Sequence, residues 1–375
     1  MKLNRTIALV SVILLAMGAL LGCGASKPVL AATVGDREVT VQQLEINYKN
    51  SLSYASAYGF DTTTDDGIAK FRDYLLGNLV ASAMKIYQAK QAGITLTDEE
   101  MAAAKDTAKK NYDDTVQSFV EQAKKAGATN VNAYAKTLLT KALVQNKTTV
   151  KKLQADMLED AINSTMVSKH RTALLEGITM SEDDLKAKYT EELASQKSLF
   201  DATPSSYFTY ESYAQYGYNA PPVYVPNGFF RVRQILVADE ATAKLIKDKI
   251  DAGEDFEALL KEYNTDPGMQ SEANAAGYLV GEGASFVESF LNAALALTKD
   301  GDVSAPVQSD YGWHIIKRVS TEPAHEIPYA DIKDAFDVYE QNAYQQQYYT
   351  DIVNKWVADT SLVTRYPDNY AAVGK

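Results

Sequence analysis

Few side chains in this chain have the types and spacing for chemistry, and the most specific arrangement lies in one short stretch. Residues 304–319 read Ser-Ala-Pro-Val-Gln-Ser-Asp-Tyr-Gly-Trp-His-Ile-Ile-Lys-Arg-Val, so that a turn and a glycine lead from Ser309 to His314 and into an apolar strand. The chain holds three histidines and one cysteine, and the other histidines are His170 and His325. No set of His, Cys and carboxylate residues has metal-ligand spacing, and no phosphate loop or nucleophilic serine motif is visible.

The pattern Pro-Val-x-Ser-x-x-Gly-x-His-Ile-Ile at residues 306–316 resembles the C-terminal signature of parvulin-type prolyl isomerases. Other motifs of that family begin before this signature, in the order in which they occur along a parvulin chain. They are Ile-Leu-Val at 235–237, Gly-x-x-Phe-x-x-Leu at 253–259, Tyr-Asn-Thr-Asp at 263–266 and Gly-x-Val-Ser-x-Pro-Val at 301–307. The resemblance covers about residues 229–320 and implies a single parvulin module with the element order β-α-α-α-β-β.

The resemblance also implies a reaction. Parvulins catalyse rotation about the bond that precedes proline, whose barrier of about 18–20 kcal/mol comes from amide resonance. A pocket that grips the proline ring, removes water from the imide and favours the twisted form is sufficient. No cofactor or metal is therefore expected.

By similarity, the polar network of a parvulin site maps onto Asp266, near the rotating carbonyl, and onto Ser309 and His314 beneath the pocket. The apolar proline pocket maps onto Leu279, Phe286 and Phe290. The two charged or titratable residues also have structural interpretations. Asp266 is equally explained as a turn residue before Pro267-Gly268, and His314 as a core histidine that only supports its strand.

Two segments depart from the family pattern. Where parvulins carry a histidine before Ile-Leu-Val, this chain has Gln234. A glutamine amide can donate and accept hydrogen bonds as a neutral imidazole does, but it does not titrate near neutral pH. Residues 275–281 read Ala-Ala-Gly-Tyr-Leu-Val-Gly in place of the usual Gly-Gly-Asp-Leu-Gly. Two interpretations follow: an isomerase that uses Gln234 as a catalytic residue, and a module that binds peptide but turns over weakly or not at all.

The surrounding sequence predicts the elements that would position these residues. Residues 229–237 are a predicted strand, and the predicted helices of the module span 241–252, 254–263 and 286–297. Residues 65–192 and 328–356 carry apolar residues at helical spacing and no catalytic cluster. A hairpin at 33–39 and a capping box at 40–43 resemble the opening of the chaperone domain of SurA- and PrsA-like foldases.

The predicted fold class is α+β, a mostly helical SurA/PrsA-like chaperone domain with one inserted α/β parvulin domain. The segments are a lipoprotein signal peptide (1–22), a tether (23–32), a helical chaperone-like domain (33–200), a Tyr- and Pro-rich linker (201–228), a parvulin-like domain (229–320) and a C-terminal helix that packs back on the helical domain (321–375). The linker tyrosines could grip a polypeptide or pack the linker against its neighbours, and the second interpretation is favoured.

The first residues of the chain indicate export and anchoring. Lys2 and Arg5 precede the apolar run 7–21, which is shorter than the roughly 20 residues of a membrane span and fits a secretory signal. Leu20-Leu21-Gly22-Cys23 resembles a bacterial lipoprotein box, which implies that a lipid on Cys23 anchors the chain at the extracytoplasmic face of the cell membrane. The alternative is an ordinary transmembrane start with an incidental cysteine.

The charge composition of the chain limits the classes of partner that it can bind. The chain has 37 basic and 49 acidic residues, a formal charge of −12, and no basic block, so nucleic acid is not expected as a partner. The resemblance implies a foldase whose partners are unfolded or newly exported polypeptides with X–Pro bonds. It leaves open whether the chain is a monomer or a homodimer. A solute-binding lipoprotein is disfavoured, because it requires two α/β lobes and the N-terminal half of this chain is helical.

Overall fold

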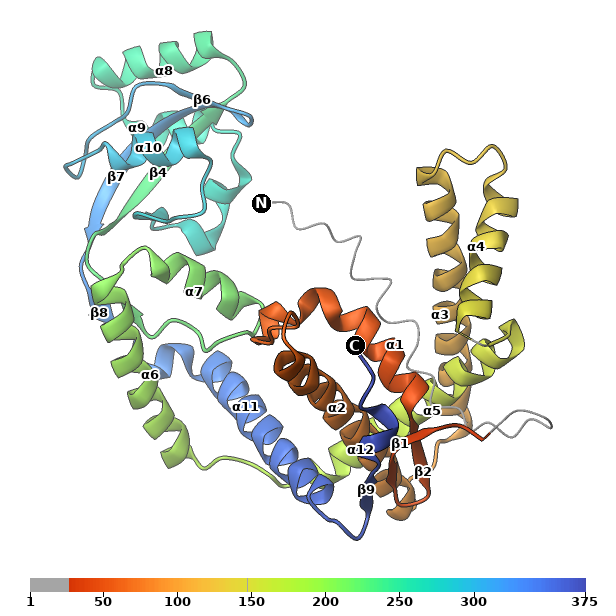
Figure 1. Ribbon diagram of the computed structural model, residues 1–375. Coiled ribbons are helices and arrows are strands. Elements are labelled where there is room, and N and C mark those ends of the chain that lie inside the picture. Colours follow the sequence, from red (N-terminus) through yellow and green to blue (C-terminus); the bar gives the residue numbers. More distant parts are fainter. Residues whose placement is uncertain (1–26, 147) are drawn as a thin grey trace. The chain divides into compact units, whose positions relative to one another are not determined.

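The computed structural model describes residues 27–146 and 148–375 (Figure 1). These residues form two compact units. The first unit runs up to Ile178 and also takes in Gln346–Lys375, whereas the second unit is Thr179–Gln345. The predicted signal peptide and Cys23 lie outside the described residues.

The first unit is mostly helical. Its helices are α1 (Val41–Ser51), α2 (Asp65–Gln91), α3 (Asp98–Lys125), α4 (Val131–Gln145), α5 (Val150–Leu175), α12 (Pro367–Tyr370) and the second half of α11 (Tyr329–Val357), with the 3₁₀ turns η1 (Leu52–Tyr54) and η2 (Ser56–Tyr58). Its strands β1 (Leu30–Val34), β2 (Arg37–Thr40) and β9 (Val363–Arg365) form an antiparallel sheet in the order β2-β1-β9. The predicted hairpin and the Thr40–Gln43 capping box are both present.

Small apolar residues let the long helices of the first unit pack closely. Ala104 and Ala108 of α3 meet Leu153 and Met157 of α5 in one buried cluster. The outer faces of α3 instead carry lysine–aspartate pairs four residues apart, such as Lys109 with Asp113. Exposed pairs of this kind contribute little to stability, so they mark a solvated face.

The second unit combines helices with a small sheet. Its helices are α6 (Glu182–Ala202), α7 (Ser206–Gln215), α8 (Glu240–Asp251), α9 (Phe256–Tyr263), α10 (Glu288–Leu295) and the first half of α11, with the 3₁₀ turns η3 (Pro267–Gln270) and η4 (Glu272–Asn274). Its main sheet is antiparallel and ordered β5 (Tyr278–Val280), β4 (Phe229–Val237), β7 (Gly312–Glu322), β6 (Val307–Ser309). A separate pair joins β3 (Tyr224–Val225) to β8 (His325–Glu326).

Side chains of a strand alternate between the two faces of its sheet, and this alternation sorts the residues of β4 and β7. Ile235 and Ile315 pack with α8 and α9 on one face. Val232 and Ile316 pack with Phe290 of α10 on the other face. Gln234 lies opposite Ile316 in the register of the two strands, so it belongs to the face covered by α10. We call this the network face, and the face covered by α8 and α9 the apolar face.

Residues 179–228 are placed differently from the predicted segments. Helix α6 continues past residue 200, where the predicted Tyr- and Pro-rich linker begins, and residues 201–228 contain α7 and β3. The reason is a buried aromatic cluster in which Phe200, Tyr207 and Phe208 surround Phe229, the first residue of β4. The segment is therefore part of the second unit.

The tyrosines of residues 201–228 differ in their burial. Tyr207 and Tyr224 are buried in the aromatic cluster, as packing requires. Tyr213, Tyr216 and Tyr218 are instead 54%, 73% and 77% exposed. Tyr210 also packs against this cluster, with its ring centroid 5.4 Å from that of Phe200.

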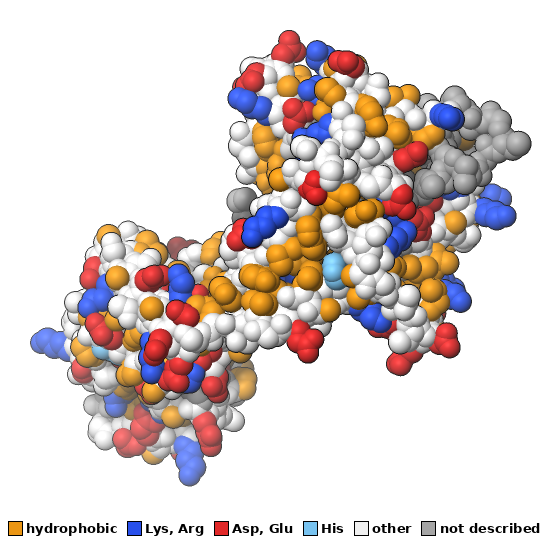
Figure 2. Space-filling model, turned by 90° about the horizontal axis from the view of Figure 1, so that it is seen from below, with side chains coloured by type: hydrophobic (Ala, Val, Ile, Leu, Met, Phe, Trp, Pro, Cys, Tyr) orange, Lys and Arg blue, Asp and Glu red, His pale blue; other side chains and the backbone are white. Residues whose placement is uncertain are grey.

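The surface mixes side-chain types. Figure 2 shows acidic and basic side chains interspersed over the face drawn, with hydrophobic side chains between them. Within residues 27–146 and 148–375, no helix combines the length and the apolar character needed to cross a membrane.

Candidate active site

A continuous line of hydrogen bonds crosses the network face and joins the four predicted polar residues. Gln234 Nε2 donates to Asp266 Oδ2 at 2.6 Å, and Gln234 Oε1 lies 2.6 Å from His314 Nδ1. His314 Nε2 lies 2.6 Å from Ser309 Oγ. Residues far apart in the sequence thus meet because β4 and β7 are neighbours and β6 forms a hairpin with β7.

The order of donors and acceptors determines which atom carries each proton along this line. An ionised carboxylate only accepts hydrogen bonds, so the amide nitrogen of Gln234 must face Asp266 and its oxygen must face His314. His314 then carries its proton on Nδ1, and its Nε2 accepts from the Ser309 hydroxyl. Gln234 therefore donates on one side and accepts on the other, as a neutral imidazole in its place would.

Burial keeps the imidazole of this line neutral. The side chain of His314 is only 3% exposed. Its burial lowers the pKa of His314 below the ordinary value of 6.5, and the nearby charge of Asp266 opposes this shift more weakly. Both ring nitrogens therefore keep the roles assigned above at neutral pH.

The backbone around Asp266 is fixed by local hydrogen bonds. Asp266 Oδ1 accepts from Gly268 N–H at 2.8 Å and so caps η3. Asn264 Oδ1 accepts the amide protons of both Leu236 and Asp266, and Asn264 Nδ2 donates to the Asp266 carbonyl at 2.9 Å. The turn role and the network role of Asp266 are thus both present, one on each carboxylate oxygen.

Aromatic rings form a wall beside the polar line. The ring centroids of Phe290 and His314 are 5.4 Å apart, those of Phe286 and Phe290 4.9 Å, and those of Tyr278 and Phe286 5.6 Å. The Tyr278 hydroxyl also donates to Asp266 Oδ2 at 2.8 Å. Burial, followed by this bond to Asp266, raises the pKa of Tyr278 above its usual range. The wall and the polar line meet at Tyr278.

Leu279, predicted for the proline pocket, is not part of this wall. It lies opposite Arg231 in the register of β5 and β4, and its side chain packs with the aromatic cluster around Phe229. Its neighbour Tyr278 lies opposite Val232 and faces the network side. Sequence reasoning missed Tyr278 and Asn264, because residue type pointed to a leucine and the strand register was unknown.

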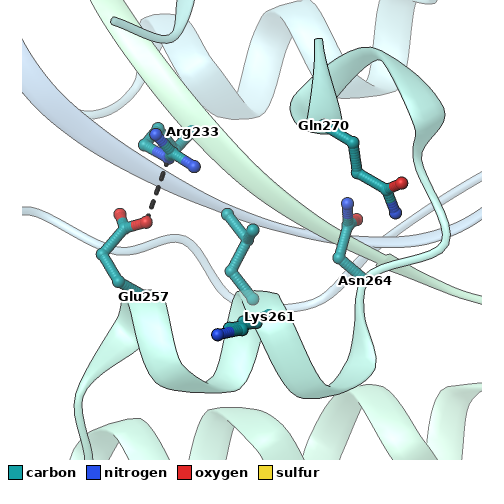
Figure 3. Close-up of a pocket in the computed structure, with 6 residues that line it drawn as sticks. Arg233, Glu257, Lys261, Asn264 and Gln270 are labelled. Atoms are coloured by element: carbon teal, nitrogen blue, oxygen red, sulfur yellow. Dashed lines mark ion pairs between the residues drawn. The ribbon is translucent and has the colours of Figure 1, made fainter. Parts of the chain in front are cut away.

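A cavity of about 360 Å³ lies beside α9 on the other side of β4. Its lining residues are Arg233, Glu257, Leu260, Lys261, Asn264 and Gln270. Figure 3 shows the ion pair of Arg233 with Glu257, at 3.2 Å, across this cavity. Arg233 precedes Gln234 on the strand and so points to the opposite face. The cavity is therefore separate from the polar line and shares only Asn264 with its support.

The remaining histidines have other surroundings. His170 is buried in the first unit and stacks on Trp356 with centroids 5.8 Å apart. His325 is exposed, and its Nδ1 lies 2.9 Å from the carbonyl oxygen of Pro323. Among the described residues, no group of three or more His, Cys, Asp and Glu side chains is arranged to hold a metal ion.

Comparison with known proteins identifies the family. Residues 213–334 match the family model of the PPIC-type PPIase domain. Foldase protein PrsA 3 of Bacillus anthracis is 31% identical over 220 residues, which cover 58% of this chain and 69% of that protein. This chain belongs to the PrsA foldase family. Foldase protein PrsA of Clostridium acetobutylicum is 22% identical over 339 residues, or 89% of this chain and 87% of that protein.

A solved structure of PrsA from Bacillus cereus covers 93% of this chain and 98% of its own at 20% identity. Its TM-score of 0.24 is too low to carry a structural argument. The family and the PPIC-type domain confirm three predictions: the PrsA/SurA-like resemblance, the α+β fold with a parvulin domain, and the class of peptidyl-prolyl isomerase. All the residues of the polar line lie within residues 213–334, which match the PPIC-type PPIase domain.

Proposed function

We propose that this PrsA-family foldase is anchored by a lipid on Cys23, acts on the extracytoplasmic side of the membrane, and accelerates X–Pro isomerisation in exported polypeptides. The family supports the foldase role, and the signal-like residues 1–23 support the anchor. The catalytic part of the proposal rests on the polar line. Its bonds from Asp266 to Ser309 are unbroken although Gln234 stands where the family pattern has a histidine.

The geometry indicates how such a site lowers the barrier. Phe286 and Phe290 supply an apolar wall that can hold a proline ring and exclude water from the imide. Loss of water favours the twisted form, in which amide resonance and charge separation are smallest. The neutral side chains of Gln234 and His314 hold Asp266 in one orientation, and no proton transfer to the substrate is required. The site therefore does not need a titratable residue at position 234, where this chain has glutamine.

One observation favours the second interpretation, a module that binds peptide with weak turnover. The bond from the Tyr278 hydroxyl occupies Asp266 Oδ2 together with the bond from Gln234. The carboxylate that the family resemblance places near the rotating carbonyl is thereby engaged with protein groups. Turnover measurements separate the two interpretations.

The direct test is NMR exchange spectroscopy of short X–Pro peptides with the purified full chain in detergent. We expect the protein to accelerate cis/trans exchange and Asp266→Ala to reduce the acceleration, since that change leaves the Gln234 amide without its partner. Gln234→His should keep the acceleration, and Asp248→Ala on the exposed side of α8 should not alter it. Peptide-induced shifts without any acceleration in the wild type would overturn the isomerase proposal and leave a binding module.

Anchoring is tested separately by cell fractionation. Wild-type chain should sediment with membranes and incorporate labelled fatty acid, whereas Cys23→Ser should incorporate none. Protease added outside intact cells or spheroplasts should digest the anchored wild-type chain if it faces outward. Equal lipid labelling of Cys23→Ser, or protection from protease, would contradict the anchor or the orientation respectively.

A further inference from the structure

Tyr278 is the polar residue at which the network meets the aromatic wall. Its hydroxyl reaches Asp266 Oδ2 at 2.8 Å, while its ring lies 5.6 Å from that of Phe286. Asp266 is only 9% exposed, whereas Tyr278 is partly exposed. A polypeptide held against Phe286 would therefore lie beside the Tyr278 ring, whose hydroxyl end is bonded to the largely buried Asp266 carboxylate.

The turn beside Asp266 leaves room for this hydroxyl. A Cβ added at Gly268 would come within 1.9 Å of the Tyr278 oxygen. Asn274 Nδ2 donates to the Gly268 carbonyl at 3.1 Å and fixes the turn in place. The glycine, the carboxylate and the tyrosine thus form one fitted arrangement, and the hydroxyl position is set by its surroundings.

Hydrogen-bond accounting shows what this hydroxyl can offer a ligand. A phenol has one proton to donate and oxygen lone pairs to accept. The Tyr278 hydroxyl donates its proton to Asp266, so the oxygen keeps lone pairs with which it can accept a hydrogen bond from a ligand at the wall. The charge of Asp266 at the far end of the bond strengthens that acceptor, because hydrogen bonds in series polarise one another.

We propose that the Tyr278 oxygen accepts a hydrogen bond from a backbone N–H next to the proline of a bound polypeptide, while its hydroxyl still donates its own proton to the hydrogen bond with Asp266. Proline itself has no N–H, so the donor is the residue before or after it. Tyr278 is in this way a substrate-binding residue that holds one side of the imide while the other side rotates. The inference rests on the proposed isomerase function, because it places the substrate at the same wall.

The experiment is a double-mutant cycle that combines a substitution in the protein with N-methylation of the peptide. The full chain and Tyr278→Phe are each titrated with an X–Pro–Y peptide and with two analogues, one N-methylated at X and one at Y. Affinity is read from peptide-induced NMR shifts and turnover from exchange spectroscopy. For the wild type, N-methylation at one of the two positions should weaken binding about three- to tenfold, the effect of one neutral hydrogen bond.

Tyr278→Phe should bind the parent peptide more weakly by a similar factor and should no longer distinguish it from that analogue. Tyr263→Phe is the matched control, because Tyr263 packs with the apolar face and loses the same atom. It should discriminate between the peptides as the wild type does. If Tyr278→Phe and wild type lose the same affinity with each analogue, the inference is wrong.

Two further observations keep the outcomes distinct. Tyr278→Phe retains the ring, and unchanged NMR signals of His314 and Phe290 would show that the site is still folded. If these signals change, the test uses the peptide affinities of the wild type alone. The inference is then overturned if neither N-methylated peptide binds the wild type more weakly than the parent peptide does. Because affinity is measured apart from turnover, an inactive wild type would refute the isomerase proposal while the binding cycle still tests Tyr278.

Discussion

The two faces of the sheet in the second unit are built from alternate residues of the same strands, yet they bury different chemistry. The apolar face holds Ile235 and Ile315 against α8 and α9, and both side chains are fully buried. The network face holds Gln234 and His314, which are also buried but polar. A shift of one residue in the register of β4 would exchange the two sets.

The comparison shows how stability and function are divided within one layer. Buried apolar side chains on one face stabilise the fold through area removed from water. Buried polar side chains are tolerated only where each hydrogen-bonding group has a partner, and the line from Asp266 to Ser309 meets that condition. The apolar face therefore stabilises the fold chiefly through apolar burial, whereas the network face combines apolar residues such as Val232 and Ile316 with the polar line.

The largest expected effect follows from a cavity in the apolar face. Ile315→Ala should lower the free energy of unfolding of the second unit by about 2–5 kcal/mol, as large-to-small changes in cores do. The two tryptophans lie in different units, so a Trp356→Phe background lets Trp313 fluorescence follow the second unit in denaturant. Leu245→Ala, at a side chain 50% exposed, should change stability by less than about 0.5 kcal/mol. A similar cost for both variants would contradict the placement of Ile315 in the core of the apolar face.

A smaller effect is expected at the end of the polar line. Ser309→Ala removes the hydroxyl that donates to His314 Nε2. It should lower the free energy of unfolding of the second unit by about 0.5–1.5 kcal/mol, since one net hydrogen bond is lost. Exchange of X–Pro peptides should slow, because the imidazole and Gln234 lose their fixed orientation. Ser309→Thr keeps the hydroxyl and should restore both properties. Failure of threonine to restore turnover would show that Ser309 acts through something other than this bond.

The most gradual effect is a dependence on pH. Because burial lowers the pKa of His314 in the folded chain, the unfolded state binds more protons between that pKa and about 6.5. The free energy of unfolding of the second unit should therefore fall as pH decreases from 6.5 through the folded pKa, and gain nothing from His314 above that window. NMR titration of the ring and unfolding at several pH values would measure both. His314→Gln should remove this component, and a ring that titrates at or above 6.5 would refute the assignment.

Local signals explain why part of the fold could be predicted from the sequence. The Thr40 and Thr97 capping boxes and the strand 229–237 depend on neighbouring residues only, and the structure contains all three. Residues 179–228 were harder to place, because their position depends on Phe200 joining Phe229 in one cluster. Such a contact between distant residues leaves no periodic pattern in the sequence.

The candidate site shows the same division. Asp266, Ser309 and His314 could be found because motif spacing is retained, and Gln234 because it replaces a histidine at a known place in that pattern. Their hydrogen bonds required the register of β4 and β7. Tyr278 was missed because a strand turns adjacent residues to opposite faces, and only the pairing of Tyr278 with Val232 shows that Tyr278, rather than Leu279, joins the wall.

The pairing of β1 with β9 has a consequence for the order of folding. Ala32 lies opposite Arg365 and Val34 opposite Val363, so one edge of the N-terminal strand is closed by the last part of the chain. Because synthesis delivers the N-terminus first, β1 remains an open edge until almost the whole protein has been made. The second unit has all its strands within residues 224–326 and can form earlier. We therefore expect the isomerase module to reach its native state before the first unit completes its sheet.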